Sequence, residues 1–515
     1  MKKFYVTTAI DYVNAAPHIG HAYEKIAADV IARYYRMRAY DVRFLTGTDE
    51  HGIKVEKSAQ AAGKSPIEFC DEIAATFQKS WVNLNLSFDY FIRTTEARHA
   101  KVVQSLFKQL LDQGDIYKST YTGLYCEGCE DFVRERDLDE NGHCPTHKKP
   151  PKAVAEENYF FKLSKYKPAI KQWLETDNNA VRPEGRRKEV LNQLNDPELG
   201  DFSVSRSRKS LNWGIPIPQD DDQVVYVWMD ALTNYITGCG YLTDDEQFAR
   251  YWPADLHLIG KDITKFHSIY WIAFLMAAKL PLPKQIFAHG FLTVEGQKIS
   301  KSLGNVIDPN QLVQKYGADA VRFFLFAGTS LDQDGDFSVA TFQDKVNAAL
   351  ANGLGNLQNR CLTLIDKHLD GIIPDCTPIQ DVRESANALH VVIESSMEKL
   401  EYMKAIEGIL ALIDLANRLM NDEKPWTLFK EGKKQEGARC LYTVIELLRR
   451  IAFQIYPFTP KLASDIWWQL GHDGEIDKIG DERNDGFFDM VPAGQKVRNS
   501  GPVFMRIETE PATAK

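Results

Sequence analysis

Long apolar runs are absent from this sequence of 515 residues. It has no stretch of about twenty consecutive apolar residues, as a membrane-spanning helix needs. Met1–Lys3 leads directly into a short apolar run instead of the apolar core of a secretory signal. We therefore expect no membrane partner and a cytoplasmic location.

Positive net charge is absent as well. The 62 Lys and Arg residues are outnumbered by 71 Asp and Glu residues, which gives a formal net charge of −9. A chain with this balance is not an indiscriminate binder of polyanions. Any contact with nucleic acid must therefore come from local groups of basic and polar side chains.

Cysteine is sparse, with eight residues in the whole chain. Most of them are scattered singly and do not indicate a disulfide framework, whereas the clustered ones fit the spacing of metal ligands. This usage predicts a reducing compartment.

The common nucleotide-binding loops are also missing. Gly63-Lys64-Ser65 looks like the end of a P-loop, but Ser58 stands where that motif needs glycine. No GxGxxG sequence follows a predicted strand. A nucleotide, if one is bound, must be held by another device.

The N-terminal residues do contain a strand-helix-strand pattern. Residues 3–10 and 41–46 are predicted to be buried strands, and between them Pro17 favours the first turn of a helix whose apolar residues recur from Ile19 onward. This unit predicts a parallel sheet with a right-handed crossover, which is half of a nucleotide-binding α/β domain. The length and the 44% apolar content predict that the chain has several domains.

His18 and His21 stand at the start of that helix. Unpaired backbone N–H groups and the positive end of the helix dipole make a helix N-terminus a ready phosphate site. Imidazoles at this place can donate further hydrogen bonds to a triphosphate. The alternative is that the two side chains only cap the helix.

Four residues have the spacing of a zinc site. Cys126 and Cys129 form one pair, and after fourteen residues Cys144 and His147 form a second. Two such pairs can close a tetrahedron around one zinc ion and leave no position open for catalysis. We therefore predict one structural zinc per chain, with the adjacent His143 as a less favoured substitute for His147.

Two signatures carry a resemblance to a known family. His18-Ile19-Gly20-His21 matches the HIGH motif of class I aminoacyl-tRNA synthetases. Nearly three hundred residues later, Lys298-Ile299-Ser300-Lys301-Ser302 resembles their KMSKS loop, with Ile299 in place of methionine. Along almost the whole chain, the surrounding sequence is similar to that of the methionyl-tRNA synthetases.

The resemblance implies an α/β fold in which a Rossmann-type parallel-sheet catalytic domain is split by a zinc-knuckle insertion. A stem-contact region and an all-α anticodon-binding helix bundle would follow. The expected ranges are 1–116 and 225–290 for the catalytic halves, 117–224 for the insertion, 291–343 for the stem-contact region and 344–515 for the bundle.

Within this plan, the apolar residues Val224–Asp230 are expected to resume the catalytic sheet as a strand. Relatives that select isoleucine, valine or leucine carry a large hydrolytic editing domain at the place of the insertion. The insertion of this chain is too short for such a domain.

The resemblance also implies which residues form the sites. The catalytic residues would be His18, His21, Lys298 and Lys301. ATP would be held by Gly20, Gly260, Asp262, His289 and Lys301. Methionine would be held by Ile10, Tyr12, Asp49, Trp228, Ala231, Leu232, Tyr235 and His267. The anticodon would be bound by Asn356, Arg360 and Trp426.

The implied reaction joins L-methionine to ATP and then transfers the methionyl group to the 3′ end of tRNA(Met), both initiator and elongator. Mg²⁺ would accompany ATP, and no side-chain nucleophile is needed. The sequence ends at Lys515 without the appended tRNA-binding and dimerising domain that some members have. We therefore expect a monomer.

Three other functions fit the sequence less well. A cysteinyl synthetase would place zinc in the active site to bind the substrate thiolate, whereas the clustered cysteines of this chain fall in the insertion. A non-enzymatic RNA-binding paralogue is expected to have lost the signature histidines or lysines, which this chain keeps. A small-molecule nucleotidyltransferase would have no use for an anticodon-type bundle.

Overall fold

The structure is a computed structural model, and it describes residues 2–129, 131–133, 135–146, 148–299, 304–478 and 491–508. Two predicted site residues, His147 and Lys301, lie outside the described residues, as do Ser300 and Ser302 of the lysine loop. No helix in the described ranges is long and apolar enough to cross a membrane.

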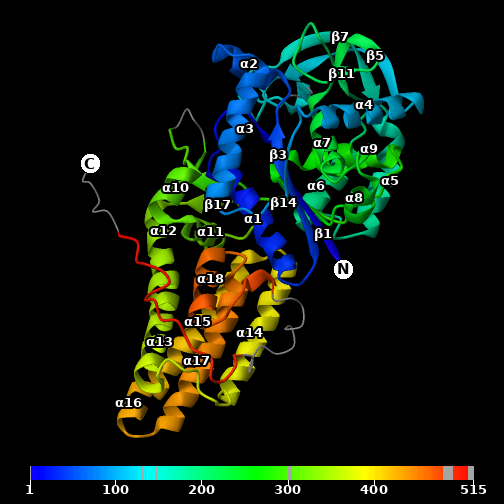
Figure 1. The fold of residues 1–515 in the computed structure, drawn as a ribbon. Coiled ribbons are helices and arrows are strands. Elements are labelled where there is room, and N and C mark those ends of the chain that lie inside the picture. The colour runs from blue at the N-terminus through cyan, green and yellow to red at the C-terminus, as the bar shows by residue number, and fades with distance from the viewer. Residues whose placement is uncertain are drawn as a thin grey trace.

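A seven-stranded parallel sheet forms the centre of the catalytic region (Figure 1). Its order is β2-β3-β1-β13-β14-β8, with β4 also paired to β3. The strands are β1 (Lys3–Thr8), β2 (Asp11–Tyr12), β3 (Asp41–Asp49), β4 (Tyr90–Arg93), β8 (Val181–Arg182), β13 (Leu256–Gly260) and β14 (Ile286–His289). The predicted Rossmann-type α/β sheet is confirmed.

The first crossover helix, α1 (Ile19–Arg36), joins β1 to β3, which pair in parallel. The helix begins where the sequence predicts, and its apolar residues Ala22, Tyr23 and Ile26 are buried. The other helices of the catalytic halves are α2 (Ile53–Ala61), α3 (Pro66–Asn83), α4 (Ala97–Asp112), α7 (Val227–Thr237), α8 (Asp245–Tyr251), η2 (Lys261–Ile263), the π-helix η3 (Phe266–Trp271) and α9 (Ile272–Ala277).

The prediction that Val224–Asp230 resumes the catalytic sheet is wrong. Val224 and Val225 end β12 (Asp220–Val225), which belongs to a small antiparallel sheet, and α7 already begins at Val227. All eleven residues of α7 are buried. A helix that is buried all round gives the same continuous apolar run as a buried strand, so periodicity cannot separate the two.

Most strands of residues 117–224 lie in antiparallel sheets of their own, and one, β8, joins the catalytic sheet. The four-stranded sheet has the order β6-β5-β7-β9, whereas β8 pairs in parallel with β14 at the edge of the large sheet. The elements of this region besides β8 and β12 are β5 (Ile116–Cys126), β6 (Asp131–Val133), η1 (Glu135–Asp137), β7 (Lys152–Phe161), α5 (Leu163–Thr176), α6 (Glu184–Asn195), β9 (Phe202–Ser203), β10 (Ser205–Ser207) and β11 (Pro216–Ile217).

A short mixed region links the sheet to the bundle. It contains β15 (Leu292–Val294), β16 (Gln297–Lys298), α10 (Pro309–Tyr316), α11 (Ala318–Ala327) and β17 (Gly335–Phe337). Glu295 and Gly296 connect β15 to β16 with positive φ angles of 50° and 72°. Two consecutive residues with positive φ are the geometry of a tight type I′ hairpin, which presents Lys298 on its outgoing strand.

The remaining chain is a helix bundle that lies beside α1, α10 and α11 (Figure 1). Its elements are α12 (Val339–Val346), the π-helix η5 (Asn347–Gly355), α13 (Asn356–Leu369), α14 (Gln380–Glu398), α15 (Tyr402–Glu423), α16 (Pro425–Lys430), α17 (Lys434–Ile455), α18 (Pro460–Gln469) and η6 (Ile476–Lys478). The predicted all-α C-terminal region is confirmed.

Two hydrophobic cores hold these parts together, one on each face of the large sheet. Successive residues of one strand, such as Tyr5 and Val6 in β1, belong to different cores because side chains alternate across a sheet. The core on the Val6 side continues through α1 into the helix bundle. The core on the Tyr5 side continues through α7 into the insertion.

Candidate active site

His18 and His21 both cap α1. The Nδ1 atom of His18 accepts the Gly20 backbone N–H at 3.1 Å, and the Nδ1 atom of His21 accepts the His18 backbone N–H at 3.1 Å. The two rings are stacked, with centroids 3.8 Å apart. The capping role considered as an alternative is therefore real, and it engages Nδ1 of each ring.

These caps decide which nitrogen of each neutral ring carries the proton. A neutral imidazole whose Nδ1 accepts a hydrogen bond carries its proton on Nε2. Desolvation, together with His18 and Lys25, holds the pKa of His21 well below its usual value, so this ring is neutral at pH 7. The N-terminus of α1 thus combines a helix dipole with two imidazole N–H groups, which suits phosphate oxygens.

The lysine loop approaches this helix end. A Cβ atom built on Gly20 would lie 3.5 Å from Cδ1 of Ile299 and 2.9 Å from Cε1 of His18. The backbone N–H of Ile19 donates to the carbonyl of Ile307, just beyond the loop, at 3.0 Å. The two signature segments, far apart in sequence, therefore lie side by side, and a side chain at position 20 would displace the His18 ring.

Gly260, Asp262 and His289 lie together at the carboxyl ends of β13 and β14. A Cβ atom on Gly260 would come within 2.8 Å of Asp262 Oδ1 and 4.0 Å of His289 Cε1. Ligands of open parallel sheets bind at such strand ends. Desolvation raises the pKa of Asp262 above its usual value, with Lys298 among the charges that act in the opposite direction.

Sequence reasoning missed a buried charge network beneath this end of the sheet. The Lys25 ammonium donates to Asp11 Oδ1 at 2.6 Å, to Glu24 Oε1 at 2.9 Å and to the Ala9 carbonyl at 3.0 Å. Glu24 Oε2 lies 3.0 Å from His289 Nε2. The available signal was a Glu-Lys pair inside the apolar stripe of α1, where charges are rarely buried unless paired.

Desolvation raises the pKa of Asp11 to about 7 despite the nearby Lys25. The network joins α1 to the strand end that carries Ile10 and Tyr12. It therefore connects the phosphate end of the site to the neighbouring pocket.

A cluster of buried aromatic side chains lies on the other face of the sheet. The rings of Trp228 and Phe266 are stacked with centroids 3.7 Å apart, and His267 stands edge-on to Trp228 at 6.5 Å. His267 Nδ1–H donates to the Ile263 carbonyl at 2.9 Å, so its Nε2 accepts the Tyr235 hydroxyl at 2.7 Å.

Desolvation lowers the pKa of His267 to about 4, which keeps the ring uncharged at pH 7. Apolar walls with one neutral, fixed polar pair suit an uncharged side chain without strong hydrogen-bonding groups.

The other predicted pocket residues come from two places. Ala231 and Leu232 are buried on α7, which also carries Trp228 and Tyr235. Tyr12 of β2 pairs with Asp49 at the end of β3, and Asp49 is buried there. Ile10 and Tyr12 are partly buried against the same core as the aromatic pocket. The structure therefore brings all eight predicted methionine residues to one region.

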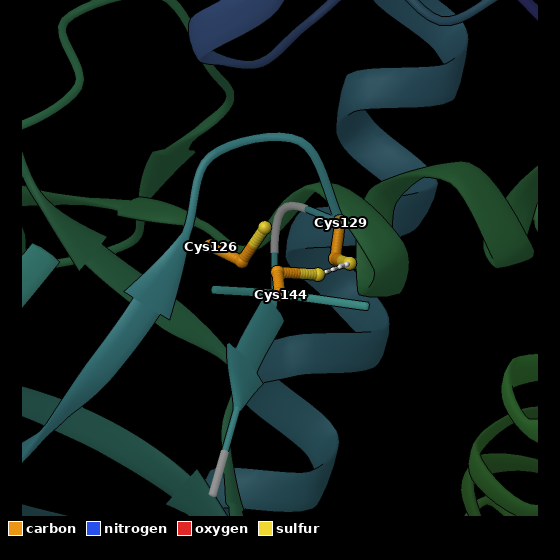
Figure 2. A group of neighbouring side chains, drawn as sticks. All are labelled: Cys126, Cys129 and Cys144. Atoms are coloured by element: carbon orange, nitrogen blue, oxygen red, sulfur yellow. Dashed lines mark hydrogen bonds between the residues drawn. The ribbon is translucent and has the colours of Figure 1, made fainter. Parts of the chain in front are cut away.

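Three cysteines of the insertion gather around a common point (Figure 2). The sulfur atoms of Cys126, Cys129 and Cys144 all lie within 4.8 Å of one another, and those of Cys129 and Cys144 are 3.6 Å apart. This separation is too long for a disulfide but is close to the edge of about 3.8 Å in a zinc-thiolate tetrahedron. The cluster can hold a metal ion.

The predicted anticodon residues meet on one side of the bundle. The Arg360 guanidinium lies over the Trp426 ring at 5.4 Å, and its Nη2 donates to Asn421 Oδ1 at 3.4 Å. Asn356, one turn before Arg360 on α13, is exposed. Trp426 belongs to the first turn of α16 rather than to the end of the preceding helix, and it is only partly buried.

Two family models match the chain. The family described as "tRNA synthetases class I (M)" matches residues 4–150 and 139–362. The family described as "Anticodon binding domain of methionyl tRNA ligase" matches residues 379–514.

Curated relatives are similar over nearly the full chain. A "Methionine--tRNA ligase" of Halalkalibacterium halodurans is 43% identical and is matched over 100% of this chain and 80% of its own length. The ligase of Thermotoga maritima is 43% identical over 99% of this chain and 81% of its own. The ligase of Thermosynechococcus vestitus is 43% identical over 98% and 97%.

Solved structures share the fold. The methionyl-tRNA synthetase of Mycobacterium tuberculosis in complex with methionyl-adenylate superposes with a TM-score of 0.92 at 40% identity, covering 98% of this chain and 100% of that chain. The free form of the same enzyme gives a TM-score of 0.86 at 36% identity, covering 99% of each chain.

Proposed function

This chain belongs to the class I methionyl-tRNA synthetases, the methionine–tRNA ligases, and we propose how its own residues perform that family's reaction. Two half-reactions are involved: the methionine carboxylate attacks the α-phosphate of ATP, and a hydroxyl of the terminal adenosine of tRNA then attacks the adenylate. The observation that carries the assignment is the contact between the two signature segments at Gly20 and Ile299.

At the phosphate end, His18 and His21 would donate their Nε2–H groups to phosphate oxygens. Lys298 and Lys301 would close over the departing pyrophosphate. Since negative charge grows on this group, fixed donors and positive charges stabilise the transition state more than the ground state. Mg²⁺ bound with ATP would supply further positive charge to the same oxygens.

For the nucleoside, Gly20 and Gly260 would allow close approach of the backbone, and the Asp262 carboxylate would accept from the ribose hydroxyls. His289 lies beside both Gly260 and Glu24 and would contact ATP on that side of the site. A carboxylate suits the role because it can accept two hydrogen bonds at once.

Asp49 would hold the α-ammonium group of methionine, with Ile10 and Tyr12 beside it. The thioether would enter between Trp228, Ala231, Leu232, Tyr235 and His267. A thioether accepts only weak hydrogen bonds, so selection here rests on shape and desolvation.

We further propose that the three-thiol cluster holds zinc, with His147 as the fourth ligand. The sulfur separation of 3.6 Å and the thiolate-rich donor set fit a closed structural site. Thiols that bind zinc must be reduced, which agrees with a cytoplasmic location.

On the bundle, Asn356, Arg360 and Trp426 would bind the anticodon of tRNA(Met). RNA bases of a loop can be stacked on an aromatic ring and hydrogen-bonded by amide and guanidinium groups. Acceptance of both initiator and elongator tRNA, the monomeric state and the five domain ranges remain predictions.

Charging of tRNA tests the proposal. Purified protein with ATP, Mg²⁺ and methionine is expected to esterify a transcript of tRNA(Met) and to lose at least tenfold in kcat/KM when the anticodon is replaced. A protein that charges both transcripts equally would contradict the anticodon role, and one that charges neither would contradict the assigned reaction.

A further inference from the structure

A buried carboxylate joins three elements next to the proposed methionine pocket. The Asp230 Oδ2 atom lies 2.7 Å from Nδ1 of His51, and its Oδ1 atom lies 2.8 Å from Nε2 of His99. Asp230 is 1% exposed and His99 is fully buried. None of these three residues belongs to the predicted site.

Both imidazoles donate to this carboxylate. Burial raises the pKa of Asp230, but His51 and His99 outweigh it and hold the pKa below its usual value, so the group is ionised at pH 7. An ionised carboxylate can only accept hydrogen bonds, and both contacts are therefore N–H donations from the rings.

The elements that meet here carry the two halves of the pocket. Asp230 lies on α7 between Trp228 and Ala231, which form the pocket wall. His51 stands two residues after Asp49, the proposed holder of the methionine ammonium group. The Asp230–His51 hydrogen bond is thus a direct polar link between the wall and the ammonium site.

The turn that carries His51 is itself tightly held. The Trp213 indole N–H donates to the Glu50 carbonyl at 2.5 Å, and the Gly52 N–H donates to the Trp213 carbonyl at 3.2 Å. The Glu50 carboxylate accepts two N–H groups of Arg93, at 2.7 and 3.0 Å. Because these contacts hold the turn rigid, the position of Asp49 depends on the hydrogen bond between His51 and Asp230.

His99 provides an internal comparison. It donates to the same carboxylate at nearly the same distance, and its Nδ1 lies 3.1 Å from the Thr237 hydroxyl. However, His99 lies on α4, which carries no residue of the proposed pocket. A structural role is open to both histidines, whereas a link to Asp49 is open only to His51.

We propose that His51 is a positioning residue for methionine, which acts through Asp230 to fix the distance between Asp49 and the aromatic wall of α7. The inference rests on the proposed methionine pocket. Directional hydrogen bonds from a carboxylate set such a distance more narrowly than apolar contacts, and a pocket that selects by shape depends on it.

The test compares matched variants in ATP–pyrophosphate exchange, with wild-type protein as the reference. His51→Phe keeps the ring size and removes the hydrogen bond, whereas His51→Asn keeps an N–H near the place of Nδ1. His99→Phe and His99→Gln, which keeps an N–H near Nε2, form the second pair. KM for methionine, KM for ATP and the melting temperature are measured for each.

We expect His51→Phe to raise KM for methionine at least tenfold while KM for ATP stays within twofold, and His51→Asn to recover most of the loss. His99→Phe should lower the melting temperature and leave KM for methionine within about twofold. If His51→Phe does not fold, His51→Gln is used in its place, because its N–H group lies too far out to reach Asp230 as Nδ1 does. Its KM for methionine is then compared with that of His51→Asn.

An unchanged KM for methionine in the folded His51 variant would overturn the proposal, as would equal changes in the His51 and His99 pairs. The proposed methionine pocket is tested separately: Asp49→Asn should raise KM for methionine even where His51 is unchanged. Wild-type protein that fails to exchange with methionine would contradict the proposed function rather than this inference.

Discussion

The two faces of the catalytic sheet differ in what they hold and in what stabilises them. On one face, α1 carries His18 and His21, which are proposed to bind phosphate, and the core behind it continues into the helix bundle. On the other face, α7 and η3 carry the aromatic residues proposed to bind methionine, and the core behind them continues into the insertion. The two proposed sites thus share one sheet but pack against different neighbours.

Buried contacts show how firmly the phosphate face is joined to the bundle. Arg322 of α11 donates to Asp29 of α1 at 2.6 Å and to the Pro457 carbonyl at 2.8 Å, while the Tyr402 hydroxyl donates to the Ala27 carbonyl at 2.8 Å. Helix α1, which begins at the signature histidines, is therefore held in place by the domain proposed to bind the anticodon.

The largest effect is expected from the zinc site. Cys126→Ser removes one of the proposed thiolate ligands and should abolish the binding of zinc. The insertion should then lose much stability, because structural zinc contributes on the order of 10 kcal/mol to the folding of its site. Elemental analysis measures the metal content, and thermal unfolding measures the consequence. If the two cores unfold separately, the melting temperature of the insertion should fall while the melting temperature of the bundle stays unchanged.

A metal content near zero or near two in wild-type protein would contradict the single zinc site. A Cys126→Ser variant whose whole chain unfolds in one lowered transition would contradict the separation of the cores.

Loss of an imidazole at the phosphate end should come next. His18→Ala should lower kcat of ATP–pyrophosphate exchange by roughly 10²–10³-fold, the scale for one preorganised donor. KM for methionine should change little, because the pocket lies on the other face. The helix also loses a cap worth about 1 kcal/mol, which a melting curve detects.

His18→Asn is the control, since asparagine also caps helices well but places its N–H differently. Recovery of the melting temperature without recovery of kcat would separate capping from catalysis. Recovery of both would show that the histidine only caps.

A smaller effect is expected at the bundle. Trp426→Ala should remove a stacking platform worth about 1–3 kcal/mol per base, and so lower kcat/KM for tRNA charging tenfold or more. Exchange without tRNA should stay near wild type, because the sheet is untouched. Arg360→Ala should act on the same step through loss of a charged donor.

Melting curves separate the two possible roles of Trp426. If its side chain mainly supports the fold, its removal should lower the stability of the bundle by several kcal/mol. A folded Trp426→Ala protein that charges tRNA normally would exclude the anticodon role.

The smallest effect concerns a substrate rather than a residue. Norleucine replaces the thioether sulfur by a methylene, and a pocket that selects by shape discriminates such a change by about 1–3 kcal/mol. Norleucine should therefore be activated measurably in the exchange assay. Complete rejection of norleucine would contradict selection by shape and desolvation.

Much of this arrangement could be predicted from sequence because the signals are local. The helix start at Ile19 and the cysteine spacing depend on residues close in the chain, whereas the roles of Asn356 and Arg360 follow only from the family resemblance. The strand predicted at Val224–Asp230 failed because full burial removed the periodicity that distinguishes a helix.

The polar networks could not be predicted, because their members are distant in sequence. Lys25 and Asp11 are 14 residues apart, whereas His51 and Asp230 are separated by 179 and His99 and Asp230 by 131. Only the fold brings these groups together, and charges inside apolar segments were the sole hint that partners existed.

ATP–pyrophosphate exchange with each of the twenty amino acids tests the central claim most directly. It reports adenylate formation at the junction of the two faces and needs no tRNA. Methionine is expected to support exchange far better than any other amino acid, with leucine and cysteine near background. A faster exchange with leucine or cysteine would contradict the assigned pocket and therefore the assigned reaction.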